Sequence, residues 1–336
     1  MKLRFVMFVV VAAFALVAVA ASACGDDDNT SATITPAASS AASTTAAASP
    51  SAAAAYPVTV TDLLGRSVEI KAKPKAVVAL SPTAVEFVYA AGGTVIGRTT
   101  TVDYPEAAKS AKDIGSAYQP SMEVILGLKP DLIVADSVLD AQPNIRKPLE
   151  DSGVPVIFAG VDSYQKVLDG LALMGKVFDA QATTAKVAAD VTKARDDAKA
   201  AIAGKSVTAL AMIADETNTF YAAKENSYAG DVMKQIGLTN PAAGQPDSGP
   251  FPGYTAIAPE KVVQYNPDFI FAISPQPEPA PRLSAIIPQV PPFKSLKAVT
   301  TPGHLVEAPV ELITSPGPRI IDAFKALAAA VTGQKN

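Results

Sequence analysis

The stretch SMEVILGLKPDLIVA, Ser121 to Ala135, recurs in register as APEKVVQYNPDFIFA, Ala258 to Ala272. In each copy a glutamate, Glu123 or Glu260, precedes a Pro-Asp pair by the same spacing. Each copy predicts a short helix that carries the glutamate in its first turn, where the helix dipole favours an anion, and that ends before the proline. The apolar run that follows is typical of a parallel strand buried on both faces. The repeat therefore predicts two α/β lobes.

Other apolar runs predict further strands in both halves of the chain. They span residues 76–80, 94–97, 154–158, 207–213 and 305–307. Between the halves, residues 164–178 and 181–203 carry apolar side chains at helical spacing, and Gly204 follows as a stop. A helical connection resists the wide hinge closure that loop connections allow. We therefore predict two Rossmann-like α/β lobes joined by a long rigid backbone helix, with limited opening and closing.

The N-terminal segment predicts export. Lys2 and Arg4 precede an uncharged run from Phe5 to Ala23. The end of this run, Ala21-Ser-Ala-Cys24, resembles the bacterial lipobox, in which the cysteine is diacylated, and this implies a lipid anchor at Cys24. The alternative is a permanent transmembrane helix, since the uncharged run is long enough to span a bilayer. We expect the anchored form, on the outer face of the bacterial cell membrane or in the periplasm.

Composition narrows the partners and divides the chain. Residues 29–55 contain only Ala, Ser, Thr, Pro, Asn and Ile, which cannot bury a core and predict a tether. Without Lys2 and Arg4 the chain has 26 basic and 32 acidic residues, a net charge of −6, which argues against a nucleic-acid partner. The predicted segments are a lipoprotein signal peptide (1–23), a disordered tether (24–56), an N-terminal lobe (57–163), linking helices (164–204) and a C-terminal lobe (205–334).

Several stretches in a fixed order resemble the cobalamin- and siderophore-binding proteins of ABC importers. Besides the repeat, they are VTDLLGR from Val60, VVALSP from Val77 with Glu86 after it, DYP from Asp103, and SPGPR ending at Arg319. The resemblance covers residues 58–331 and implies two α/β lobes on one long backbone helix, a shallow ligand cleft between them, and little movement on binding. It also implies that one surface glutamate per lobe, Glu123 and Glu260, docks on the two permease subunits.

Aromatic residues near strand ends are the candidate walls of the ligand cleft. Open α/β sheets bind ligands beyond the carboxyl ends of their strands, and flat rings suit large planar chelates. The ligand-binding candidates are Tyr104, Tyr118, Phe220, Tyr221 and Tyr254, with Arg98 and Arg319 as cations for ligand oxygens. By resemblance, Tyr118 and Tyr254 occupy ring-stacking positions. The alternative is that some rings pack beneath their loops and that the arginines are ordinary surface residues.

The expected function is that of a solute-binding lipoprotein. We expect it to capture a metal chelate, a ferric siderophore first and cobalamin next, for an ABC permease dimer with its ATPase. We expect a monomer without a cofactor, a catalytic residue or a metal site of its own. An enzyme is disfavoured, because the only histidine, His304, lies in a turn where we interpret it as a solvated loop residue. An anchored interaction module and a hydrolase without a transport role stay open as alternatives.

Overall fold

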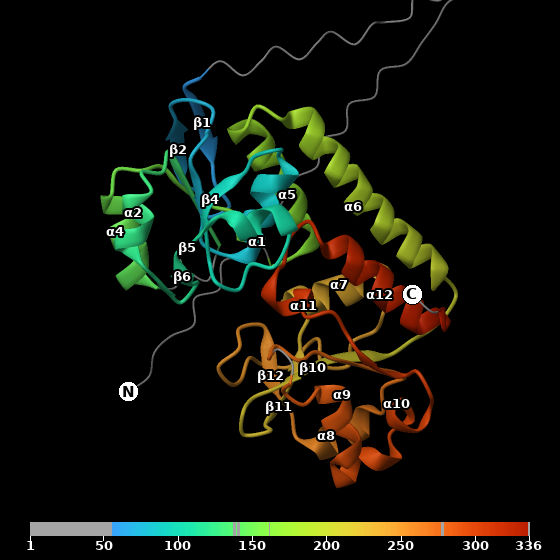
Figure 1. Ribbon diagram of the computed structural model, residues 1–336. Coiled ribbons are helices and arrows are strands. Elements are labelled where there is room, and N and C mark those ends of the chain that lie inside the picture. Colours follow the sequence, from blue (N-terminus) through green and yellow to red (C-terminus); the bar gives the residue numbers. More distant parts are fainter. Residues whose placement is uncertain (1–55, 137–138, 140–141, 161, 277–278, 335–336) are drawn as a thin grey trace, which may run out of the picture. The chain divides into compact units, whose positions relative to one another are not determined.

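The computed structural model describes residues 56–136, 139, 142–160, 162–276 and 279–334. The predicted signal peptide, Cys24 and residues 24–55 of the predicted tether lie outside these described residues. The described residues belong to one contact unit and form two α/β lobes with helices between them (Figure 1). Among the described helices, none combines the length and the hydropathy that crossing a bilayer requires.

The N-terminal lobe is built around a five-stranded parallel sheet. Its strands lie in the order β5 (Lys112–Asp113), β4 (Val95–Arg98), β3 (Val77–Ala79), β8 (Leu132–Ala135) and β9 (Val156–Phe158). Its helices are α1 (Pro82–Ala90), α2 (Met122–Gly127), α4 (Pro143–Asp151) and the 3-10 helix η1 (Glu106–Ser110). Two hairpins complete the lobe: β1 (Val58–Thr61) with β2 (Ser67–Ile70), and β6 (Gly115–Ser116) with β7 (Gln119–Pro120).

Successive residues of β3 face opposite sides of this sheet. Val77 and Ala79 belong to the core that includes Val85 of α1. Val78 belongs to a separate core that includes Ile125 of α2. Because both faces are covered, each residue of the strand is apolar and buried, which explains the continuous apolar runs in the sequence.

The C-terminal lobe contains a second five-stranded sheet. Its strands lie in the order β12 (Tyr254–Ala256), β11 (Phe220–Ala223), β10 (Ala209–Ala214), β13 (Phe269–Ala272) and β14 (Leu305–Glu307). Its α-helices are α7 (Tyr228–Ile236), α8 (Pro259–Tyr265), α9 (Leu283–Ile286), α10 (Lys297–Thr300), α11 (Glu311–Thr314) and α12 (Ile320–Thr332). Its 3-10 helices are η2 (Ile287–Gln289) and η3 (Pro291–Ser295).

One strand of this second sheet, β11, runs antiparallel to the other four. β10 pairs in parallel with β13, as the apolar run predicts, but β11 pairs antiparallel with both β10 and β12. Neither β11 nor β12 is among the strands that the sequence predicts. Their short segments follow polar loops, and a short apolar run bounded by polar residues can be either a strand or part of a loop.

The repeated Pro-Asp pair has the same structural role in both lobes. The Asp131 carboxylate accepts hydrogen bonds from the backbone N–H groups of Lys75 (2.8 Å) and Ala76 (3.0 Å), just before β3. The Asp268 carboxylate accepts one from the N–H of Thr208 (2.8 Å), just before β10. Each aspartate therefore ties the strand that it begins to the neighbouring central strand. The predicted repeat is confirmed as a repeated helix-to-strand unit, α2 to β8 and α8 to β13.

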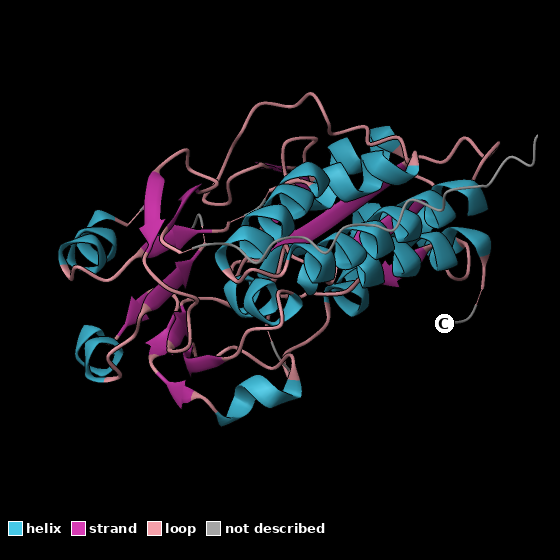
Figure 2. Ribbon diagram, turned by 90° about the horizontal axis from the view of Figure 1, so that it is seen from above, coloured by secondary structure: helices cyan, strands magenta, loops and turns pink. Residues whose placement is uncertain are grey.

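Two helices connect the lobes: α5 (Tyr164–Val177) and α6 (Gln181–Ala201). Their bounds match those of the predicted helices within two residues at each end. α6 runs beside α12 in Figure 1. Figure 2 shows many helices packed side by side. α5 and α6 approach closely at Gly175, where an added Cβ would lie 2.4 Å from Oγ1 of Thr184. One apolar core also contains Val77 of β3 and Ala209 of β10, so it is continuous through both lobes.

Candidate functional site

Side chains from both lobes meet around Arg319, directly before α12. Glu86 comes from the middle of α1, and Asp103 and Tyr104 follow β4. From the C-terminal lobe, Glu311 lies in α11, which follows β14. We call six residues the interlobe cluster: Glu86, Asp103, Tyr104, Glu311, Ser315 and Arg319. The cluster follows the carboxyl ends of β4 and β14, the end of parallel strands at which open α/β sheets bind ligands.

The ion pair between Glu86 and Arg319 joins the two lobes. Nε of Arg319 donates to Oε1 of Glu86 at 2.6 Å, and its backbone N–H donates to Oε2 at 3.3 Å. The hydroxyl of Ser315 donates to the same carboxylate. The Glu86 side chain is 1% exposed and that of Arg319 is 15% exposed. Removing one partner of a pair buried to this degree leaves the other charge without compensation.

Two further carboxylates approach the same guanidinium. Nη1 of Arg319 donates to Oε1 of Glu311 at 3.0 Å, and Nη2 lies 3.8 Å from Oδ1 of Asp103. Burial raises the pKa of Glu86 above its usual value, while Arg319 and the hydrogen bond from Ser315 oppose that effect. Burial lowers the pKa of Arg319, but the nearby carboxylates outweigh burial and leave that pKa raised. The guanidinium is therefore held in its charged form.

Two of the predicted ligand-binding tyrosines present their rings to solvent. Tyr104 is 49% exposed, and Cζ of Arg319 lies 4.8 Å from the centroid of its ring, a cation–π contact. Tyr118 is 67% exposed and lies in the turn between β6 and β7. Both rings come from the N-terminal lobe, and Tyr104 lies at the boundary between the lobes. Exposed rings of this kind can stack against a flat ligand.

The other three predicted aromatics are buried. Phe220 is 5% exposed and packs edge-on against Phe293, with ring centroids 5.2 Å apart. Tyr221 is also 5% exposed, and its hydroxyl donates to Asp215 at 2.8 Å. Tyr254 is 6% exposed, and burial raises the pKa of its hydroxyl. In this structure the three rings pack in the core of the C-terminal lobe, so their direct contact with a ligand stays a prediction.

The second predicted cation, Arg98, is held within the N-terminal lobe. Its Nη1 donates to the carbonyl oxygen of Thr99 at 3.0 Å and lies 3.5 Å from Oδ2 of Asp113. The side chain is 15% exposed. Arg98 supports the segment after β4 that carries Tyr104, and its contact with a ligand stays a prediction.

The two repeat glutamates occupy equivalent exposed positions. Glu123 lies in the first turn of α2, where Ser121 caps the helix by accepting from the N–H of Val124. Glu260 lies in the first turn of α8, directly after Pro259. The helix dipole favours an anion at both positions. One exposed carboxylate on each lobe is therefore available to a partner.

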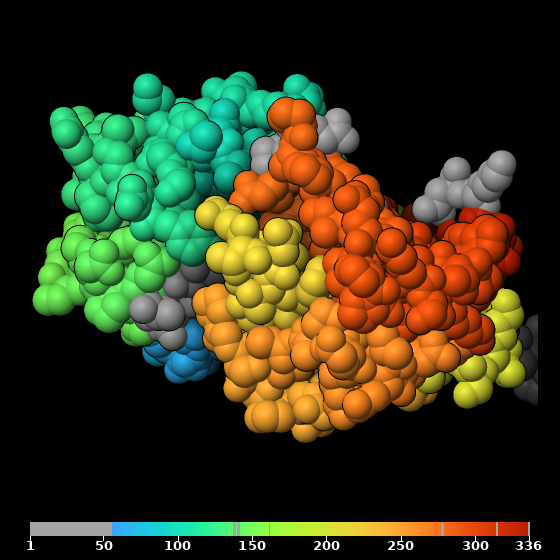
Figure 3. Space-filling view, turned by 90° about the horizontal axis from the view of Figure 1, so that it is seen from below, coloured from blue at the N-terminus to red at the C-terminus, as the bar shows by residue number. Residues whose placement is uncertain are grey.

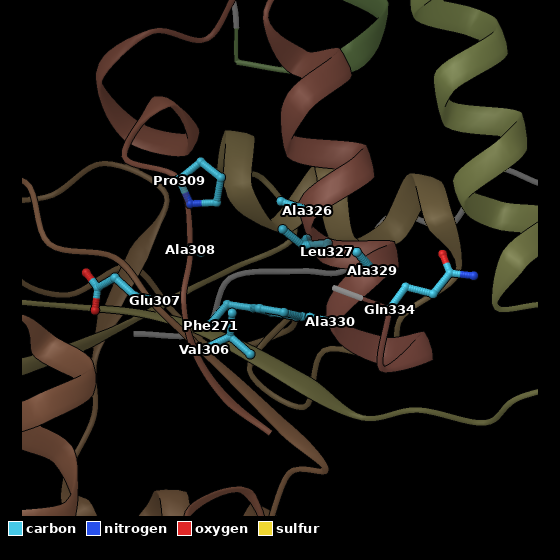
Figure 4. Close-up of a pocket in the computed structure, with 10 residues that line it drawn as sticks. All are labelled: Phe271, Val306, Glu307, Ala308, Pro309, Ala326, Leu327, Ala329, Ala330 and Gln334. Atoms are coloured by element: carbon cyan, nitrogen blue, oxygen red, sulfur yellow. The ribbon is translucent and has the colours of Figure 1, made fainter. Parts of the chain in front are cut away.

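Two pockets lie within the C-terminal lobe. The larger, about 380 Å³, lies between β13, β14 and α12, with Glu307 and Gln334 at opposite ends in Figure 4. The smaller, about 290 Å³, is lined by residues 218–220 and 256–259, at the edge of the sheet where β10 ends. Neither pocket is lined by a residue of the N-terminal lobe, whose green and teal surface meets the yellow and orange C-terminal lobe in Figure 3.

His304 packs against the second sheet instead of lying free in solvent. Its Nδ1 is 2.8 Å from the carbonyl oxygen of Asp268, and its ring stacks on that of Phe269, with centroids 4.0 Å apart. His304 therefore lies in the turn directly before β14, as interpreted from the sequence, but it is half-buried and not fully solvated. Within the described ranges, no group of three or more His, Cys, Asp or Glu side chains is placed to hold a metal ion.

Sequence reasoning missed the carboxylates that surround Arg319. From the sequence, Glu86 was named only as part of the family resemblance and was given no role. It is nevertheless the one charged residue in the otherwise apolar or neutral helix PTAVEFVYA. A lone charge on a helix that is buried over most of its length signals a buried partner. Glu311 carries no such signal, because it lies in a short helix with both polar and apolar neighbours.

We predict that Glu86→Ala lowers the free energy of unfolding by about 3 kcal/mol, because it leaves Arg319 buried without its main partner. Glu150→Ala is the matched control, since Glu150 pairs with Arg66 (2.6 Å) and Arg146 (2.9 Å) but is 38% exposed. The control should cost less than about 1 kcal/mol. Urea unfolding of the full chain measures both values, and equal losses for the two variants would contradict the assignment of Glu86 as the main link between the lobes.

The sequence is similar to a known protein family and to several of its members. The model of the periplasmic binding protein family matches residues 77–309. The uncharacterized ABC transporter substrate-binding lipoprotein YvrC of Bacillus subtilis is 24% identical over 284 residues, covering 82% of this chain and 86% of that protein. The cobalamin-binding protein of Halobacterium salinarum is 25% identical over 285 residues, covering 82% of this chain and 74% of that protein.

A solved structure shows the same fold. The petrobactin-binding protein YclQ of Bacillus subtilis superposes with a TM-score of 0.71 at 20% sequence identity, covering 82% of this chain and 98% of that one. The predicted fold class, two α/β lobes joined by helices, is confirmed. The family match spans more than half of the sequence and includes strands of both sheets. The chain therefore belongs to the periplasmic binding protein family.

Proposed function

We propose that this chain is the substrate-binding protein of an ABC importer, and that it captures a metal chelate outside the cytoplasm. Family membership and the similarity to YvrC, which is named as an ABC transporter lipoprotein, support the transport role. We place the ligand site at the interlobe cluster because the exposed Tyr104 ring lies on Arg319 where the two lobes meet. Binding there would bring a ligand into contact with both lobes at once.

The chemistry around this cluster suits a ligand that brings its own metal ligands. Tyr104 and Tyr118 offer aromatic surface, and the guanidinium of Arg319 is already engaged with the carboxylates of Glu86 and Glu311. A ferric siderophore and cobalamin both present large, partly apolar surfaces and enclose their metal in donor atoms of the chelate. We rank the ferric siderophore first and cobalamin second, and a haem belongs to the same class of ligand.

We further propose that Cys24 anchors the protein to the membrane and that the two exposed glutamates dock on the permease. Diacylation at Cys24 would hold the protein on the outer face of the membrane, as the lipobox resemblance implies. Glu123 and Glu260 would then dock on the two permease subunits, one glutamate from each lobe. Opposite charges at two separated points steer encounter and set the orientation of the complex. The linking helices α5 and α6 favour delivery with little movement between the lobes.

We predict that one class of chelate raises the melting temperature of the full chain. The probes are a ferric trihydroxamate, a ferric triscatecholate, cyanocobalamin and haem, each compared with its metal-free or unrelated counterpart. A ligand present at about 100 times its dissociation constant stabilises the native state by about 2.7 kcal/mol. For about 280 folded residues that corresponds to a rise of roughly 4–5 °C. No rise with any probe would favour an anchored interaction module without a small ligand.

If Glu123 and Glu260 dock on the permease, their substitution should reduce uptake without changing binding of the chelate. Glu123→Lys with Glu260→Lys should lower cellular uptake of the labelled chelate on the order of tenfold, because like charges would then meet in the complex. The dissociation constant for the chelate should not change. Glu69→Lys is the matched control, since Glu69 is also exposed but lies on β2, outside the repeat. Uptake by the double variant equal to that of the control would exclude the glutamates as docking residues.

A further inference from the structure

Arg319 is surrounded by more negative charge than it can neutralise. Its guanidinium pairs with Glu86 at 2.6 Å and Glu311 at 3.0 Å, and Asp103 lies at 3.8 Å. One positive and three negative charges leave a net charge of −2 on these four side chains. If Glu86 takes up a proton, the net charge is still negative. An approaching anion therefore meets carboxylates that already occupy the guanidinium.

The other candidate cation near this edge is compensated as well. Arg98 is 15% exposed, and its guanidinium contacts Asp113 together with the carbonyl oxygen of Thr99. The N–H of Gly115 donates to Asp113 and, with the hydroxyl of Thr100 and the charge of Arg98, holds the pKa of that carboxyl below its usual value. Asp113 therefore keeps its negative charge at neutral pH. Neither of the two arginines that the sequence singles out offers an uncompensated positive charge.

The carboxyl end of β10 in the C-terminal sheet also carries negative charge. In the turn between β10 and β11, Asp215 accepts hydrogen bonds from the N–H and hydroxyl of Thr217 and from the N–H of Thr219. These bonds, with that from the Tyr221 hydroxyl, lower the pKa of Asp215 to about 2. The next residue, Glu216, is exposed. The same turn borders the smaller pocket through Asn218, Thr219 and Phe220.

We propose that the interlobe cluster selects uncharged or positively charged metal chelates and discriminates against anionic ones, with Asp103 and Glu311 as the specificity-determining residues. This inference rests on the proposed function and names the class of substrate that the site takes. An anionic chelate must either displace a carboxylate from Arg319 or remain close to unscreened negative charge. An uncharged chelate can stack on Tyr104 while the ion pairs stay intact, and a cationic one gains attraction to Asp103, which is 74% exposed.

The test uses chelates that share one iron centre and differ only in charge. Ferric desferrioxamine B carries one positive charge, its N-acetyl derivative is neutral, and its N-succinyl derivative carries one negative charge. Cyanocobalamin, which is neutral, and its monocarboxylic acid derivative form a second matched set. Titration calorimetry of the full chain should show affinity falling on the order of fivefold per unit of negative charge added to the ligand. The difference should shrink between about 20 mM and about 500 mM salt.

Two variants test whether Asp103 and Glu311 cause the charge preference. Asp103→Asn and Glu311→Gln should each narrow the ratio between the affinities for the positive and the negative derivative. Glu69→Gln, which removes a distant exposed carboxylate, should leave the ratio unchanged. Thermal unfolding of each variant identifies any that fails to fold, and the exposed position of Asp103 makes Asp103→Asn the safer of the two.

Failure of the charge preference and failure of the proposed transport role give different results. If no member of either set binds and neither a ferric triscatecholate nor haem binds, the proposed function fails, and the charge preference fails with it. If only the anionic triscatecholate binds, the charge preference alone is overturned. If a chelate binds but the negative derivative binds as tightly as the positive one, the charge preference is overturned while the transport role stands. If the preference persists unchanged in both variants, Asp103 and Glu311 are not its cause.

Discussion

The ion pair between Glu86 and Arg319 is the interaction on which the arrangement of the lobes depends. It lies between α1 of one lobe and the start of α12 of the other, and both side chains are largely withdrawn from water. Burying these charges is costly unless each finds its partner and its remaining hydrogen bonds. Ser315 and Glu311 supply those bonds from the C-terminal lobe. The same contacts hold Tyr104 on the guanidinium, so the link between the lobes also positions an exposed ring.

Much of the fold could be predicted because two lobes repeat one unit. The Pro-Asp pairs at 130–131 and 267–268 end a helix and begin a buried strand, and the aspartates bond to the backbone before β3 and β10. The antiparallel strand β11 and its edge neighbour β12 were not predicted. Phe220 and Tyr221 follow a polar turn. The sequence pattern does not show that β11 pairs with β12, which lies more than thirty residues further along the chain. Such pairing is decided by tertiary packing and not by local preference.

The site could be predicted only in part, because residue type does not reveal burial. Tyr104 and Tyr118 are exposed, whereas Tyr254 and Tyr221 lie in the core, although all four are tyrosines near strand ends. The contact of Arg319 with ligand oxygens stays a prediction, and the structure shows three carboxylates around its guanidinium. Those carboxylates are 8, 216 and 233 positions away in the sequence, so no local pattern could assemble them.

The position of the ligand site is tested most directly by locating the metal of a bound chelate. Crystals of the full chain grown with the iron chelate that binds in titration would be measured at the iron absorption edge, and an anomalous difference map calculated. We expect one strong peak at the boundary between the lobes, with the chelate in contact with the Tyr104 ring and near Arg319. A peak at the pocket between β14 and α12, or on the outer surface of one lobe, would contradict it.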